Sequence, residues 1–236
     1  MNRMRFLFLI MLFIALFYPT KGANAQSSIS SLDKVYGLDP VLYNGKIYSY
    51  FLASGTGGTQ FLFDPDFTEG SATIRGITYD KLDLNYDVFN KQVIFQYEPR
   101  EGGRKQIVLS DAWLDKFNLG NVHFEMLAIE DTIRQIYQVI GIGPYRVLYS
   151  WRKDLALDTH LGATNHVFSK PIRTAFLFEG GRLRKFKNNK SFVALFNPTG
   201  QTALKKYLRQ KHVNLKKASD EVIIQLLNYC NSLSLK

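Results

Sequence analysis

The stretch GSATIRGITYDKLDLNYDVFNKQVIFQY, residues 70–97, decides the fold. Apolar and aromatic residues alternate with polar ones in two parts of it: Leu82, Leu84 and Tyr86, then Val93, Phe95 and Tyr97. Breaks rich in Gly, Asp and Asn fall at Gly76, at residues 79–81 and at residues 90–91. Alternation with a period of two, interrupted by turn residues, is typical of antiparallel strands with one buried face. We therefore expect an antiparallel β-meander here.

The same strand pattern extends to both sides of this stretch. We expect a hairpin at Asn44-Gly45, because Asn-Gly between apolar runs is a strong hairpin signal. Further strands are expected at residues 107–109, 123–129, 135–142 and 145–151, and a hairpin at residues 173–187. Residues 111–117 are expected to form a short helical turn, and residues 153–170 the longest loop. Residues 26–187 thus predict a β-rich body, built as a meander, a curved sheet or a sandwich.

The spacing of apolar residues becomes helical in the last part of the chain. We expect Ser191 to cap a first helical turn, Pro198 and Gly200 to interrupt it, and a second helix over residues 202–212. Ser219 is a good N-cap for a last helix, whose apolar face includes Cys230. Residues 188–236 therefore predict a small helical subdomain, and the fold class is mainly β (α+β).

The beginning of the chain resembles an export signal. Two arginines precede an apolar run at residues 6–18, and Ala23-Asn24-Ala25 follows as a small-x-small cleavage site. The run would span only about 20 Å as a helix, which is too short for a membrane. We expect a signal peptide over residues 1–25 and no membrane span after its removal. Cys230, the single cysteine, is expected to be a buried small hydrophobe.

The net charge of +10 is concentrated at the C-terminal end of the chain. Residues 182–236 hold twelve Lys and Arg against Asp220 and Glu221, whereas residues 26–181 hold fifteen basic and eighteen acidic residues. This asymmetry favours an anionic partner such as an envelope lipid or glycan; export argues against nucleic acid. Equally, the lysines could simply solvate the outer faces of two helices. The candidate binding residues are Arg182, Arg184, Lys185, Lys187, Lys205, Lys206, Arg209, Lys216 and Lys217.

Motifs for catalysis, metals and cofactors are weak or incomplete. The glycine-rich residues 54–59 have neither the lysine nor the following helix of a phosphate-binding loop. The acidic stretch 64–69 offers three carboxylates, fewer ligands than calcium requires. His160 and His166 are six positions apart rather than the four that suit a helical zinc site. We therefore expect no enzyme activity, no metal and no cofactor.

Several segments taken together resemble a known group of proteins. In chain order they are GSATI at 70–74, LDLNYD at 82–87, VIF at 93–95, FLFEGGRL at 176–183, KNNKSF at 187–192 and LLNYCN at 226–231. With the export signal, this order is similar to a broad group of uncharacterised exported proteins of Bacteroidota. The resemblance covers most of the mature chain but involves turns and core positions, so it transfers no active site. It implies a periplasmic or outer-membrane-associated location in a Gram-negative cell.

These features are compatible with three functional hypotheses. The first is a non-catalytic envelope protein that serves as a binding or structural accessory to an outer-membrane or periplasmic partner. The second is a periplasmic carrier or chaperone with an apolar groove for a lipidated or unfolded client, which an enclosed apolar cavity of several hundred Å3 would favour. The third is an enzyme acting on envelope glycans, which two facing carboxylates roughly 5–10 Å apart would favour.

Overall fold

The structure is a computed structural model that describes residues 37–49, 52, 55–63, 65–130, 132–158 and 165–233. All of the described strands and helices lie within the unit Leu38–Lys236. The predicted signal peptide, Ser54, Asp64 and His160 lie outside the described residues. Thirteen strands and three helices are described, which confirms the predicted mainly β fold with a helical C-terminal part. No helix in the described ranges is long and apolar enough to cross a membrane.

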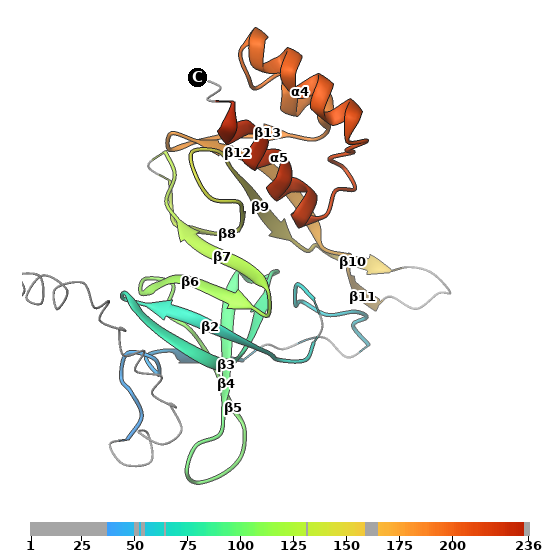
Figure 1. Ribbon diagram of the computed structural model, residues 1–236. Helices are drawn as coiled ribbons and strands as arrows, with labels where there is room; N and C mark the ends of the chain where they lie inside the picture. The colour runs from blue at the N-terminus through green and yellow to red at the C-terminus, as the bar shows by residue number, and fades with distance from the viewer. Residues whose placement is uncertain are drawn as a thin grey trace, which may run out of the picture. The chain divides into compact units, whose positions relative to one another are not determined.

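Eleven strands form one antiparallel sheet (Figure 1), in the order β1-β5-β4-β3-β2-β6-β7-β8-β9-β12-β13. Their bounds are β1 Lys46–Ile47, β2 Thr68–Ile74, β3 Ile77–Asp87, β4 Gln92–Tyr97, β5 Lys105–Val108, β6 Leu114–Leu119, β7 Val122–Leu127, β8 Gln135–Ile140, β9 Arg146–Arg152, β12 Ile172–Glu179 and β13 Arg182–Phe186. A separate hairpin pairs β10 Leu155–Asp158 with β11 Asn165–Phe168. Neighbouring strands are mostly consecutive in the chain, so this is the meander that the sequence predicts.

The central meander differs from the prediction at one point. The sequence predicts a turn at residues 79–81, but they lie within β3, which runs for eleven residues. The pairing of β2 with β3 shifts register between Gly70 and Ser71, and Lys81 adopts a φ of 57°. An extra residue in one strand is a β-bulge, which bends and twists a strand without ending it. The polar residues at this bulge therefore give the same sequence pattern as a turn, although the strand continues through them.

The expected hairpin at Asn44-Gly45 does not form. β1 pairs with β5 instead, and the turn lies earlier, where the carboxylate of Asp39 accepts a hydrogen bond from Val41 N at 2.7 Å. A Cβ added to Gly45 would lie 2.3 Å from the carbonyl oxygen of Val108. The glycine is therefore required by the close approach of β5 rather than by a turn.

Two other segments contain strands that the sequence does not predict. Residues 111–113 do turn, but β6 begins at Leu114. The pairing of β6 with β2 shifts register opposite Thr73 and Ile74, which adds one residue between Leu114 and Phe117. These two apolar residues are therefore three positions apart, a spacing that resembles a helix. The expected loop at residues 153–170 contains the β10–β11 hairpin. In both cases pairing with a distant strand decides the structure, which local patterns cannot reveal.

Three helices follow the sheet: α3 Asn189–Val193, α4 Pro198–Gln210 and α5 Asp220–Ser232. They lie at the β8–β13 end of the sheet (Figure 1) and share one hydrophobic core with it, in which Tyr149 and Leu177 of the sheet meet Phe192 and Leu226 of the helices. Cys230 belongs to the same core and is fully buried, which confirms its predicted role as a small hydrophobe.

The helix starts differ in detail from those predicted. Asn188, not Ser191, is the N-cap of α3; Ser191 occupies the third position and bonds back to the cap in a capping box. Pro198 does not interrupt α4 but begins it, with Asn197 as the N-cap. Proline is well suited to the first helical position because the N–H it lacks would have no partner inside the helix.

Candidate functional site: a basic-rimmed groove between α3 and α4

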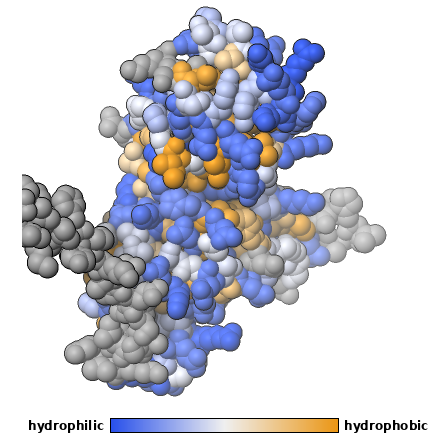
Figure 2. All heavy atoms as spheres, viewed as in Figure 1, coloured by the Kyte–Doolittle hydropathy of each residue, from blue (hydrophilic) through white to orange (hydrophobic). Residues whose placement is uncertain are grey.

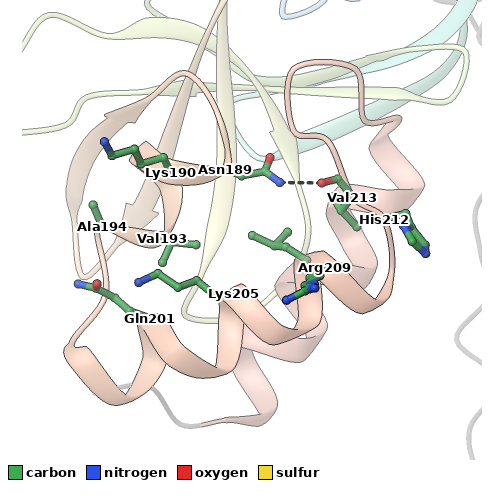
Figure 3. Close-up of a pocket in the computed structure, with 10 residues that line it drawn as sticks. Asn189, Lys190, Val193, Ala194, Gln201, Lys205, Arg209, His212 and Val213 are labelled. Atoms are coloured by element: carbon green, nitrogen blue, oxygen red, sulfur yellow. Dashed lines mark hydrogen bonds between the residues drawn. The ribbon is translucent and has the colours of Figure 1, made fainter.

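A cleft with a volume of about 730 Å3 lies between α3 and α4. Val193 and Ala194 contribute apolar surface from α3, and Leu208 and Val213 from α4 and the segment after it. Basic side chains surround this floor: Lys190, Lys205, Arg209 and His212. Figure 3 shows Val193 and Lys205 in the space between the two helices, with Lys190 and His212 at opposite ends in this view. We call this feature the α3–α4 groove.

One face of α4 supplies most of the polar rim. Gln201, Lys205 and Arg209 follow one another at intervals of four residues, so they fall on one side of the helix, and His212 comes two residues after its end. The opposite side is anchored, because Tyr207 stacks on Tyr229 of α5 with ring centroids 4.3 Å apart and planes 17° apart. The amphipathic pattern therefore holds α4 in place while presenting its cations to the groove.

The end of α4 forms a capping motif that shapes the groove. Val213 N donates to Leu208 O at 3.0 Å, and His212 N donates to Arg209 O at 3.3 Å. These two bonds form a Schellman motif, which places the residue after the C-cap in the left-handed region. That residue is His212, with a φ of 51°. Glycine usually fills this position because other residues are strained there.

Asn189 forms a support behind the groove. Its side-chain Nδ2 donates to Val213 O at 2.6 Å (Figure 3), and its Oδ1 accepts from Leu215 N at 2.9 Å. One side chain thus fixes the segment that follows α4 against the start of α3. The relative position of the two walls is determined by these hydrogen bonds and by the shared core.

The electrostatic character of the groove is wholly positive. Residues 188–219 contain no Asp or Glu, but seven Lys and Arg: Lys190, Lys205, Lys206, Arg209, Lys211, Lys216 and Lys217. Within the part of the chain that the structure describes, the side chains of Lys190, Lys205 and Arg209 make no hydrogen bond or ion pair. Long hydrophilic side chains project over α4 in the space-filling view (Figure 2). Cations without protein partners are free to bind an anion.

The structure brings only two of the predicted binding residues, Lys205 and Arg209, into the groove. Arg184 is engaged elsewhere, by the Glu179 carboxylate and the carbonyl oxygen of Leu195. The others are exposed at separate places: Arg182, Lys185 and Lys187 on or next to the edge strand β13, Lys206 on α4, and Lys216 and Lys217 in the turn before α5. Their positive charge is thus spread over several faces.

Sequence reasoning missed the remaining groove residues. Lys190 and His212 could not be identified as binding residues, because they form a groove only when α3 packs beside α4, and the sequence does not reveal that packing. The spacing of residues 201, 205 and 209 was a usable signal, since it places three polar side chains on one side of a helix. The apolar floor gave no such signal, because its residues resemble ordinary core positions.

A second cleft, of about 630 Å3, lies at the sheet turns and contains three linked polar residues. Glu125 contacts His123 Nε2 at 3.2 Å and Arg146 Nη1 at 3.4 Å, and the Arg146 guanidinium lies 4.7 Å from the ring centroid of Phe178. The hydrogen bond from His123, with the nearby charge of Arg146, lowers the pKa of Glu125 although burial opposes this. Its charges already pair with one another, so this cleft is less suited to binding an ion.

A third, smaller cleft is acidic. It has a volume of about 380 Å3 and is lined by Asp66, Asp83 and Glu98, with Arg104 and two aromatic rings. Across all described residues, no group of three or more His, Cys, Asp or Glu side chains is arranged to hold a metal ion. The α3–α4 groove is therefore the described cleft that is best suited to a negatively charged ligand.

The chain matches no family model, no curated protein and no solved structure.

Proposed function

We propose that this protein is an exported cell-envelope protein that acts by binding rather than by catalysis, and that the α3–α4 groove binds an anionic component of the envelope. The observation that carries the proposal is that Lys190, Lys205 and Arg209 all line one cleft whose described lining contains no carboxylate. The export signal and the resemblance to exported Bacteroidota proteins support the location.

The groove favours binding over the simpler explanation that the lysines only keep helix surfaces hydrated. Solvated helix faces normally mix both signs of charge, which relieves repulsion between neighbouring side chains. Here Lys205 and Arg209 are one helical turn apart, and like charges at this spacing destabilise a helix by about 0.2–0.5 kcal/mol. A cleft lined by one sign of charge also concentrates the field and attracts ions of the opposite sign. A binding role therefore explains why like charges are placed next to each other here.

The test compares two double charge reversals that change the net charge equally. Lys205→Glu with Arg209→Glu alters the groove, and Lys206→Glu with Lys216→Glu alters exposed positions outside it. Binding to dextran sulfate and to phosphatidylglycerol vesicles at low salt is measured by co-sedimentation and calorimetry. Each lost ion pair is worth up to about 1 kcal/mol and its reversal adds repulsion, so we expect the groove variant to bind at least about tenfold more weakly.

The control variant should keep most of its affinity, and binding of the unaltered protein should weaken as salt screens the charges. Equal losses in the two variants would mean that the total charge, not the groove, attracts the anion. Failure of the unaltered protein to bind these probes and also the alkyl phosphates described below would rule out the proposed function.

A further inference from the structure

We infer that the ligand of the α3–α4 groove is a single amphiphilic molecule that has a phosphate head group and one alkyl or acyl chain. This inference rests on the proposed function and specifies its ligand. It is based on three properties of the groove: its apolar floor, its size, and the number of cations around it.

The floor is the first property. The floor of the cleft is aliphatic: Val193 and Leu208 line it from the core and are only 4% and 5% exposed, whereas Val213 and Ala194 are the more exposed part, and cations surround it. A polar anion such as a sulfated glycan would gain nothing from this surface, because apolar groups contribute affinity only when another apolar group removes them from water. A hydrocarbon chain would gain affinity from every methylene that it buries there.

The size is the second property. A volume of about 730 Å3 lies within the range of roughly 300–1,000 Å3 that is usual for clefts holding one small molecule. Inorganic phosphate would occupy only a small part of it. A flat membrane surface would not enter it. The groove therefore fits one ligand that is larger than its charged group alone.

The rim is the third property. Lys190 belongs to the α3 side of the cleft, where its amine points away from the α4 cations in Figure 3; Lys205 and Arg209 belong to the α4 side, with His212 beyond them. A phosphate monoester carries a charge of about −1.5 to −2 near neutral pH and has three strong acceptor oxygens, so it can engage several cations at once. A carboxylate carries one charge and would leave part of this rim uncompensated.

The groove is also firmly built, which favours a defined ligand over casual contact. The Asn189 clamp and the Schellman motif fix Val213 beside Leu208, and the stack of Tyr207 on Tyr229 fixes α4. A site whose walls are held in advance loses less conformational entropy when a ligand binds.

The experiment measures calorimetric affinity for ethyl, hexyl and decyl phosphate, each below its micelle-forming concentration, with inorganic phosphate, decanoate and decyl maltoside as controls. Each methylene that becomes buried should tighten binding about threefold to fourfold until the groove is full. Ala194→Trp places a large ring at an exposed position on the floor. It should weaken decyl phosphate binding at least tenfold while leaving dextran sulfate binding nearly unchanged.

The outcomes separate this inference from the proposed function. Equal affinity for ethyl and decyl phosphate, with groove-dependent dextran sulfate binding, would overturn the inference and leave the proposed function standing. Absence of binding to every anionic probe would overturn both. Equal affinity for decyl maltoside and decyl phosphate, or for decanoate and decyl phosphate, would overturn the assignment of a phosphate head group. Binding to phosphatidylglycerol vesicles but not to decyl phosphate would show that the partner is a membrane surface and not a single molecule.

Discussion

Asn189, the first residue of α3, donates a hydrogen bond from its side chain to the backbone carbonyl of Val213, just beyond α4, at 2.6 Å. The same amide accepts a hydrogen bond from Leu215 N at 2.9 Å. The partners of the first bond are 24 positions apart in the chain, so this side chain joins the beginning of the helical part of the fold to the segment that follows α4. It links the stability of the fold to the shape of the α3–α4 groove.

We predict that Asn189→Ala lowers the free energy of unfolding by about 1–3 kcal/mol, because it leaves Val213 O and Leu215 N without their partner. Asn189→Asp keeps the acceptor but loses the donor, so its cost should be intermediate. Urea unfolding measures both variants, with the exposed Asn228→Ala on α5 as the matched control. A change in Asn189→Ala no larger than in the control would show that the clamp is not important for stability.

His212→Gly is expected to stabilise the protein. His212 adopts a φ of 51°, which costs a residue with a Cβ roughly 1–2 kcal/mol relative to glycine; the gain is partly offset because glycine is more flexible when unfolded. A net gain of about 0.5–1 kcal/mol would raise Tm by roughly 1–4 °C in a chain of this size. Lys211→Gly, one residue earlier at a φ of −91°, should destabilise instead. If both variants shifted Tm in the same direction, conformational strain at His212 would not be the cause.

Much of the β-rich body could be predicted from the sequence because its strands pair mainly with their neighbours. The alternation of Leu82, Leu84 and Tyr86 depends only on local pleating, and all three side chains are buried as expected. The errors fall where a distant segment decides the geometry. Gly45 lies in a sequence that resembles a hairpin turn, but glycine is required there because β5 passes close to its backbone. Phe117 has a helix-like spacing from Leu114 because a β-bulge opposite β2 adds a residue between them.

The candidate site was less predictable than the fold. Charge counting identified the basic end of the chain and included Lys205 and Arg209. It could not separate them from Lys206, because neighbouring residues on a helix point about 100° apart and only packing reveals which direction faces a partner. It also missed Lys190, which becomes a groove residue only because α3 lies beside α4.

Gly70 in the central meander allows β2 and β6 to approach closely. A Cβ added there would lie 2.0 Å from the carbonyl oxygen of Asn118, so Gly70→Ala should cost at least about 2 kcal/mol. Gly76 provides the comparison: it has a φ of +79° but no atom within 4 Å of the added Cβ, so Gly76→Ala should cost only the strain, about 1 kcal/mol. Denaturant unfolding measures the loss of unfolding free energy in each variant. A smaller loss for Gly70→Ala than for Gly76→Ala would contradict the close approach of β6.

Cys230 should be chemically inert in the folded protein. It is fully buried, and burial raises the pKa of its thiol to about 12, so almost no thiolate is present at pH 8. A disulfide reagent such as dithionitrobenzoate should label it only after unfolding in urea. A cysteine placed at the exposed Ser232, in a Cys230→Ala background, supplies the reactive control. Rapid labelling of native Cys230 would show that α5 opens readily from the core.

Glu125 should make stability depend on pH in the acid range. The hydrogen bond from His123 and the charge of Arg146 hold its pKa below the ordinary value of 4.5. The unfolded chain therefore takes up the proton at a higher pH than the folded chain, so the stability from Glu125 is complete above about 4.5 and is lost as the pH falls further. Glu125→Gln should be less stable than the unaltered protein at pH 7, and the difference should narrow in acid. The control is Glu101→Gln at an exposed position, whose stability difference from the unaltered protein should not change with pH. If the stability difference between Glu125→Gln and the unaltered protein also stayed constant from pH 7 into the acid range, Glu125 would not be the cause of the pH dependence.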